Sequence, residues 1–288
     1  PALAPVGHEL AAFGITGVTD ATVGLDPGRL GLLLAARAEG AIPQQLLLLG
    51  VDDEAELGRR AQRGPAKLLA DEFGGLDPDA LTEAIRAHHD RGRAVAIHAV
   101  TRAENIAAVA ALRAAGVRPG DRIEHGSVLP TDLDAHLAAG GITVIIQPAL
   151  VAERGDHHLR AVDPEDLPLL HRQASLLAAG VAVAAGSDAP VTSVDPWRAI
   201  AAATDRRTRR GAVLGPAERV SARTALNWFL TPLEDPAGSP RRVTVGAPAD
   251  LCLLDVPLAS MLAAPDASHV RATWIDGVRI DGVPGSMV

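Results

Sequence analysis

The sequence is poor in aromatic residues: among 288 residues it holds three Trp, three Phe and no Tyr. Stacking platforms for single-stranded nucleic acid depend on such side chains. The net charge of −8 also repels phosphate backbones and anionic membrane surfaces. Because no run of about 18 apolar residues predicts a membrane span, we expect a small-molecule substrate and neither nucleic acid nor a membrane as a partner.

The sequence contains a single cysteine and a single lysine. Cys252 can form no disulfide within the chain, and no cysteine pair has zinc-site spacing. The start of the chain lacks a basic segment followed by an apolar one, so we expect a cytoplasmic protein. Lys and Arg together number 27, and Lys67 is the one lysine among them. A coding bias would replace lysine with arginine wherever any cation suffices. The retention of Lys67 therefore suggests a role that arginine cannot fill.

What the chain does contain is an alternation of apolar, β-branched runs with amphipathic helical patterns, which predicts βα units and a parallel sheet. We expect seven strands, over Ile15–Thr22, Gln45–Val51, Ala66–Ala70, Ala94–Val100, Arg122–Val128, Thr143–Pro148 and Val181–Asp188. Expected helices include Val6–Phe13, Asp77–Arg91, Ala103–Ala115 and Leu167–Ala179. An α/β fold of the (β/α)8 TIM-type barrel with its first strand missing fits this count, and an open doubly wound sheet is the alternative.

The pattern changes after Asp195-Pro196. Two helical stretches, Pro196–Ala203 and Ala217–Phe229, precede a linker containing proline and glycine over Pro232–Arg242. Two β patterns follow, Ala249–Val256 and Arg271–Ile280, which are too few for an independent domain. We therefore expect a barrel over residues 1–231 and a remnant of a small β-sandwich over residues 243–288.

Four polar residues stand at the carboxyl ends of expected strands: Lys67, His98, His125 and Asp188. Their intervals of 31, 27 and 63 residues correspond to one, one and two βα units. Chemistry collects at this end of such barrels, so we predict that the four side chains converge there.

The residue types suit a divalent metal such as zinc, because imidazole nitrogen and carboxylate oxygen are good ligands. Either histidine alone would more simply be a hydrogen-bonded core residue, and Asp188 before Ala-Pro would serve as a helix N-cap or in an Asx turn. Their common register favours a metal centre. Asp188 would both ligate the metal and accept a proton from water.

Lys67 fits this centre only as a neutral amine. Burial near positive charge lowers the pKa of a lysine, and the neutral amine reacts with carbon dioxide to give an anionic carbamate that can bridge metals. The alternative is an ion pair with Asp71 or Glu72. Asp71 and Glu104 are candidates for orienting Lys67 or an imidazole, whereas His88-His89 and His157-His158 are interpreted as solvated surface.

At these residues the chain resembles amidohydrolase family 3, the YtcJ-like metal-dependent hydrolases of the amidohydrolase superfamily. The resemblance covers nearly the whole chain and rests on the segments AKLLAD (66–71), AVAIHAVTR (94–102), DRIEHGS (121–127), GSDAPV (186–191) with DPW (195–197), and GAPADLCLLD (246–255). It implies a (β/α)8 barrel with a small β-sandwich, one or two divalent ions, a carbamylated lysine at Lys67, strand-end histidines at His98 and His125, and a ligand and proton shuttle at Asp188.

One feature of the family is missing, namely the His-x-His pair at the end of the first barrel strand. Since that strand itself is not found, we expect an N-terminally shortened chain in which one metal position is weakened. Open strand edges would invite pairing with a second copy, so a homo-oligomer is allowed.

The expected function is metal-dependent hydrolysis of a carbon–nitrogen bond of the amide type by an activated water. The alternative is a truncated or degenerate barrel that binds a ligand or a partner chain without catalysis.

Overall fold

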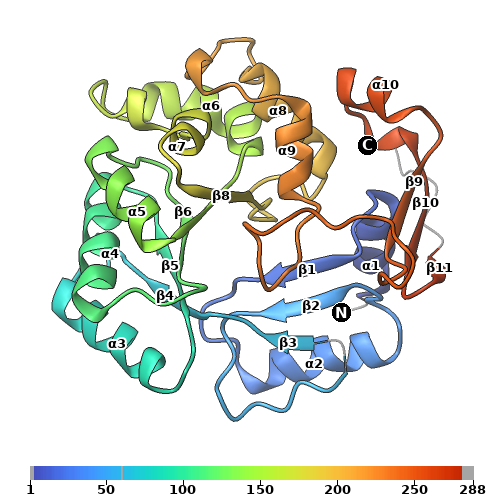
Figure 1. The fold of residues 1–288 in the computed structure, drawn as a ribbon, viewed down its shortest axis with the longest axis horizontal. Coiled ribbons are helices and arrows are strands. Elements are labelled where there is room, and N and C mark those ends of the chain that lie inside the picture. Colours follow the sequence, from blue (N-terminus) through green and yellow to red (C-terminus); the bar gives the residue numbers. More distant parts are fainter. Residues whose placement is uncertain (1–2, 60, 281–288) are drawn as a thin grey trace. The chain divides into compact units, whose positions relative to one another are not determined.

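The computed structural model describes residues 3–59 and 61–280 (Figure 1). The chain divides into two compact units. One unit holds residues 65–193 and 199–240. The other combines residues 1–64, 194–198 and 241–288. The candidate residues Lys67, His98, His125 and Asp188 all belong to the first of these, which we call the sheet unit.

The sheet unit alternates strands and helices. Its strands are β4 (Ala66–Leu69), β5 (Val95–Ala99), β6 (Arg122–His125), β7 (Thr143–Ile146) and β8 (Ala182–Ala185). Its helices are α3 (Pro78–Asp90), α4 (Arg102–Ala115), α5 (Asp134–Gly140), α6 (Ala149–Ala161), α7 (Ala174–Ala178), α9 (Ala222–Trp228) and residues 199–205 of α8 (Pro196–Asp205), with 3-10 turns η1 (Thr131–Leu133), η2 (Leu167–Leu169) and η3 (Pro216–Glu218). The five strands pair in parallel in chain order.

Local sequence explains where helices α3 and α4 of this unit begin. Asp77 precedes α3, and its carboxylate accepts the backbone N–H groups of Asp79 and Ala80, next to Pro78 in the first turn. Helix α4 begins with a capping box, in which Thr101 and Glu104 each accept a backbone N–H of the other residue. Both helices therefore start directly after a loop that follows a strand.

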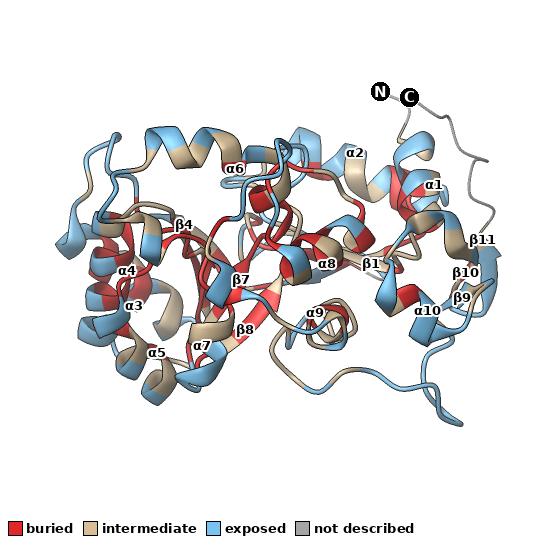
Figure 2. Cartoon of the chain, turned by 90° about the horizontal axis from the view of Figure 1, so that it is seen from above, coloured by how far each residue is buried: buried red, intermediate tan, exposed pale blue. Residues whose placement is uncertain are grey.

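The strand register separates an apolar face from a polar one. Leu68, Ile97, Ile123, Val144 and Val183 lie side by side on one face, and all but Leu68 are buried. The opposite face carries Lys67 beside Ala96 and Arg122, and Leu69 beside His98 and Glu124. Figure 2 shows buried residues along β7 and β8 and exposed residues along the outer sides of α3 and α5. The polar residues thus share the sheet face away from the apolar row.

The second unit has two small sheets. Its elements are α1 (Ala4–Ala12), β1 (Gly17–Asp20), α2 (Pro27–Ala38), β2 (Gln45–Leu48), β3 (Ala61–Arg63), β9 (Leu251–Leu254), α10 (Leu258–Ala263), η4 (Ala267–His269), β10 (Val270–Ile275) and β11 (Val278–Ile280). Strands β1, β2 and β3 are parallel, while β9, β10 and β11 are antiparallel. Gln45 bonds Asp250 at 2.8 Å and Thr273 donates to the Ala11 carbonyl at 2.6 Å, so distant segments are joined within this unit.

The α/β class and the mostly parallel pairing are confirmed. Every expected strand contains an observed one, and β3 is an additional strand that its three residues gave too little apolar pattern to reveal. Among the described residues the eight parallel strands form sheets of three and five, and no ladder closes them into a ring. The compact units do not follow the division into 1–231 and 243–288, because residues 241–288 group with residues 1–64. That division and the missing first strand stay predictions.

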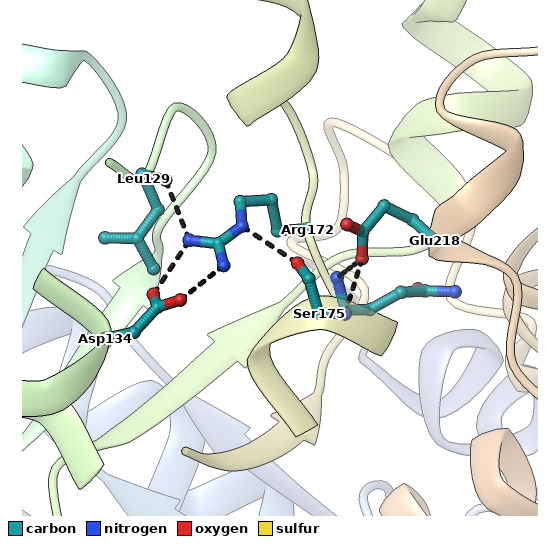
Figure 3. Close-up of polar contacts among 6 residues, drawn as sticks. Leu129, Asp134, Arg172, Ser175 and Glu218 are labelled. Atoms are coloured by element: carbon teal, nitrogen blue, oxygen red, sulfur yellow. Dashed lines mark hydrogen bonds and ion pairs between the residues drawn. The ribbon is translucent and has the colours of Figure 1, made fainter. Parts of the chain in front are cut away.

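The expected helix over Leu167–Ala179 is wrong in its middle, where residues 170–173 are not helical and side-chain contacts hold the chain (Figure 3). Arg172 forms a two-bond ion pair with Asp134 at 2.8 and 2.6 Å and donates to the Leu129 carbonyl and the Ser175 hydroxyl. Glu218 accepts the backbone N–H groups of Gln173 and Ser175 at 2.7 and 3.0 Å. Buried polar contacts of this kind outweigh helix propensity over so short a segment.

No helix in the described part of the chain combines the length and the apolarity needed to cross a membrane.

Candidate active site

His98 and His125 lie in contact at the carboxyl ends of neighbouring strands. Their ring centroids are 4.5 Å apart with an interplanar angle of 73°. Burial lowers the pKa of His98, and its electrostatic interactions with His125 and Lys67 lower it further. A lowered pKa keeps an imidazole neutral near pH 7, which is the form that binds metals.

The backbone at the end of β6 is left-handed at two successive residues, with φ of 79° at His125 and 52° at Gly126. By strand alternation the His125 side chain would point to the apolar face, so this turn is what brings its ring against His98. A Cβ on Gly126 would lie 2.8 Å from Val144 Cγ1, so only glycine fits there.

Gln147, just beyond β7, fixes the orientation of the His125 ring. Its amide nitrogen donates to the Ile145 carbonyl at 3.0 Å, so its oxygen faces His125 Nδ1, also at 3.0 Å. Nδ1 must then carry the proton, and Nε2 keeps its lone pair for a ligand. The sequence interpretation missed Gln147, although its place at the end of the β7 segment is the same signal that selected the other four residues.

Lys67 is the second residue of β4, so the expectation that it stands at the carboxyl end of its strand is wrong, and its side chain interacts electrostatically with a buried ion pair. Arg122 Nε and Glu124 Oε1 are 2.7 Å apart, and both side chains are almost fully buried. Burial lowers the pKa of Lys67; the Glu124 carboxylate opposes this shift and the Arg122 guanidinium adds to it. Burial alone would raise the pKa of Glu124, but Arg122 and then Lys67 hold it below its usual value. The sequence interpretation gave Arg122 and Glu124 no role.

Asp188 follows β8 in a left-handed conformation, with φ of 57°, and is exposed. The loop around it is held by its own backbone, since Val191 N–H donates to the Asp188 carbonyl at 2.8 Å, and by Glu153 of α6, which accepts the Ser193 N–H. Within the described residues no backbone N–H donates to the Asp188 carboxylate, so the expected alternative of a cap finds no support. The Asp188 charge reaches both Lys67 and His98.

Glu104 and Asp71 have different surroundings. Glu104 is 4% exposed, and its carboxylate accepts the N–H groups of Glu72, Val100 and Thr101 at 3.1, 2.7 and 3.0 Å. It therefore joins the loop after β4 to the loop after β5. Asp71 is exposed, and its carboxylate accepts the N–H groups of Phe73 and Gly74 in its own turn. An orienting role for Asp71 and Glu104 stays a prediction.

The candidate metal ligands are brought only partly together. In the portion of the chain that the structure describes, no three or more His, Cys, Asp or Glu residues gather closely enough to hold a metal ion. The histidine rings touch, while Lys67 and Asp188 act electrostatically on His98. The metal-ligand role of Lys67, His98, His125 and Asp188 and the catalytic role of Asp188 stay predictions.

His158 is not the solvated surface residue expected from sequence. It lies on α6, and its Nδ1 is 3.1 Å from Nε2 of His171, which is 7% exposed. His171 is in turn anchored by its N–H to the Ser127 carbonyl and by its carbonyl to Arg206 Nη1. His89 is likewise bonded, at 3.0 Å, to the buried Asp121 carboxylate.

We expect acid to destabilise the fold through the His158–His171 pair. Burial lowers the pKa of His171 well below its usual value, with His158 and Arg206 adding to the shift, and burial also lowers the pKa of His158. Below pH 6.5 the unfolded state thus binds protons that the folded state excludes, and the free energy of unfolding falls by about 1.4 kcal/mol per pH unit for each such imidazole.

Urea unfolding between pH 5.5 and 7.5 measures this slope. The slope should be smaller in His171→Gln and unchanged in His136→Gln, a partly exposed histidine of α5. Equal slopes in all three proteins would show that the pair does not control the acid response.

Comparison with known proteins adds the family. The sequence profile described as the amidohydrolase family matches residues 2–281. The N-substituted formamide deformylase of Arthrobacter pascens is 30% identical over 166 residues, which are 54% of this chain and 30% of that protein. The chain therefore spans less than a third of the length of this curated relative.

Two solved structures resemble the fold. An uncharacterized metal-dependent hydrolase from Pyrococcus furiosus matches with a TM-score of 0.61 and 23% identity, over 75% of this chain and 50% of that one. Guanine deaminase of E. coli matches with a TM-score of 0.66 and 13% identity, over 98% and 75%.

Proposed function

This chain belongs to the amidohydrolase family, and from that premise we propose that it hydrolyses a carbon–nitrogen bond of the amide type with the help of a divalent metal. The observation that carries the proposal is the contact of the two imidazoles at 4.5 Å with Lys67 and Asp188 in electrostatic reach. In support of it, the charges of Lys67 on β4 and of Asp188 after β8 both act on His98 of β5, whose ring contacts that of His125 on β6. Histidines with a purely structural role would not require a lysine and an aspartate in electrostatic reach.

The donors at this place fit a metal such as zinc. Gln147 leaves Nε2 of His125 free, burial keeps His98 neutral, and both features suit imidazole ligands. Lys67 can join them after its neutral amine adds carbon dioxide, which forms an N–C bond and releases one proton. His98, His125, the Lys67 carbamate and Asp188 would then hold the ion. The metal, when bound, polarises the substrate carbonyl and lowers the pKa of water.

The residues of the chain supply the proton transfers. Asp188, exposed and without a backbone donor to its carboxylate among the described residues, accepts a proton from the attacking water and delivers it to the leaving nitrogen. Arg122 offsets the charge of Glu124, so that Glu124 does not hold Lys67 as an ammonium. Gln147 maintains the tautomer of His125.

We also propose how the observed strands belong to a larger architecture. Strands β4 to β8 would form part of a (β/α)8 barrel, and the antiparallel strands β9, β10 and β11 part of a small β-sandwich. The support is the likeness of nearly the whole chain to guanine deaminase. Whether a second copy completes the strand edges is open to measurement of the oligomeric state.

A non-catalytic barrel that binds a ligand or a partner chain is the second candidate. The observation that favours it is the lack, within the described residues, of a cluster of three metal-binding side chains.

Metal analysis combined with an assay separates these two candidates. The panel would contain N-substituted formamides, suggested by the name of the Arthrobacter relative, and N-acyl amines. We expect a divalent metal to co-purify, a chelator to abolish turnover, and added Zn²⁺ to restore it. A protein that binds panel compounds without cleaving them, with or without metal, would instead be the non-catalytic barrel.

A further inference from the structure

We propose that Asn105, in the first turn of α4, is a positioning residue that sets the distance between His98 and His125. This inference rests on the proposed function, because it assigns Asn105 a role in the same site. The hydrogen bonds of the Asn105 side chain go to backbone carbonyls and, within the described residues, to neither ring. Asn105 acts on the two loops that leave β5 and β6 directly after the histidines.

The contacts of Asn105 all run to those loops. The side chain is fully buried, and its amide nitrogen lies 2.9 Å from the Thr101 carbonyl, 3.1 Å from the Val128 carbonyl and 3.5 Å from the Val100 carbonyl. Val100 and Thr101 follow His98 closely, and Val128 follows His125. Three carbonyl groups around one nitrogen fix the amide orientation, because the amide oxygen could accept nothing from them.

The loop after β6 needs such support. His125 and Gly126 are both left-handed, and a non-glycine residue holds that conformation only when its surroundings enforce it. Two backbone hydrogen bonds already tie this loop to the end of β5: Gly126 N–H to the Ala99 carbonyl and Val128 N–H to the Val100 carbonyl, both at 2.9 Å. The Asn105 side chain adds a further link between the same two loops, because its amide binds carbonyl groups of both.

Helix stability does not explain an asparagine at this position. Asparagine is a poorer helix former than leucine or alanine, and the Asn105 amide oxygen is buried with no partner among the described residues. A buried unsatisfied acceptor lowers stability. An apolar residue would therefore give a more stable helix. It could not donate hydrogen bonds to the carbonyl groups of the two loops.

Glu104 extends the connection to a third strand. Its carboxylate accepts the backbone N–H of Glu72, after β4, as well as the backbone N–H groups of Val100 and Thr101, after β5. Two adjacent residues of one helix thus link the loops that follow Lys67, His98 and His125. The spacing of the three candidate ligands is then set by the first turn of α4.

The test compares Asn105→Leu with Gln173→Leu in the full chain. Gln173 is a matched control, since it too is fully buried, donates its amide nitrogen to a carbonyl (Ala203, 2.8 Å) and leaves its amide oxygen without a partner in the described residues. The readouts are the imidazole ¹⁵N resonances of metal-free protein and the affinity for Zn²⁺ alone. Asn105→Leu should shift the rings of His98 and His125 and weaken Zn²⁺ binding about tenfold, whereas Gln173→Leu should change neither.

Unchanged His98 and His125 resonances in folded Asn105→Leu would overturn the proposal. If the leucine variant does not fold, Asn105→Ala, which removes the donor without adding a larger apolar side chain, is measured in its place with the same criterion. If wild-type protein binds no Zn²⁺ and cleaves no panel compound, the proposed function fails, but the ring resonances of the metal-free variants still decide the role of Asn105.

Discussion

Replacing Asp188 with Asn is expected to lower kcat about 10³-fold on any substrate that the metal-loaded wild-type protein hydrolyses. Asn has the shape of Asp but cannot take a proton from water near pH 7 or return it to a leaving nitrogen. Its amide oxygen can still approach a cation, so we expect Zn²⁺ affinity to be retained in part. KM should change little, since the lost interaction belongs to the transition state.

The measurement is steady-state kinetics on the N-acyl panel, with metal content determined for each protein. Asp90→Asn is the control, an exposed aspartate at the end of α3, which precedes β5 and so lies toward the opposite end of the strands. A variant Asp188→Asn with wild-type kcat and full metal content would remove Asp188 from the mechanism.

Residues with strong chemical character could be predicted from sequence. His98 lies near the end of β5, Asp188 follows β8, and Lys67 is the single lysine of the chain, although it lies within β4 and not at its end. The parallel pairing of β4 to β8 follows from the same spacing. The spacing of the candidates along the chain can be predicted from nearby residues, because each strand is located from its own apolar run. That is why the four candidates fall in the same sheet unit.

Residues that act through the backbone could not be predicted in the same way. Asn105 is an uncharged amide whose Val128 partner lies on another segment, and nothing in its neighbours along the chain distinguishes it from a solvated residue. Gln147 does follow a strand, but an uncharged amide at that place does not by itself indicate a histidine partner. The left-handed turn at His125 is similar, because strand alternation alone points this side chain to the wrong face. The non-helical segment at Arg172 depends on Asp134 and Leu129, which are distant in sequence.

Replacing Glu104 with Gln is expected to reduce the free energy of unfolding by about 3 kcal/mol. The Glu104 carboxylate accepts three backbone N–H groups in a buried place, with one oxygen serving Glu72 and the other serving Val100 and Thr101. A glutamine amide offers only one oxygen, so its NH₂ group must face N–H donors on one side. At least one buried donor then loses its partner, which is more costly than removing an exposed charge.

Urea unfolding at pH 7.5 tests this expectation against Glu83→Gln. Glu83 lies on α3 with 72% of its side chain exposed and pairs with Arg86 at 2.6 Å, an arrangement whose loss costs less than about 1 kcal/mol. A similar, small change in both variants would show that Glu104 is dispensable for joining the loops. If Glu104→Gln is destabilised as expected, its Zn²⁺ affinity should fall as well, because the loops that follow Lys67 and His98 are the ones its carboxylate connects.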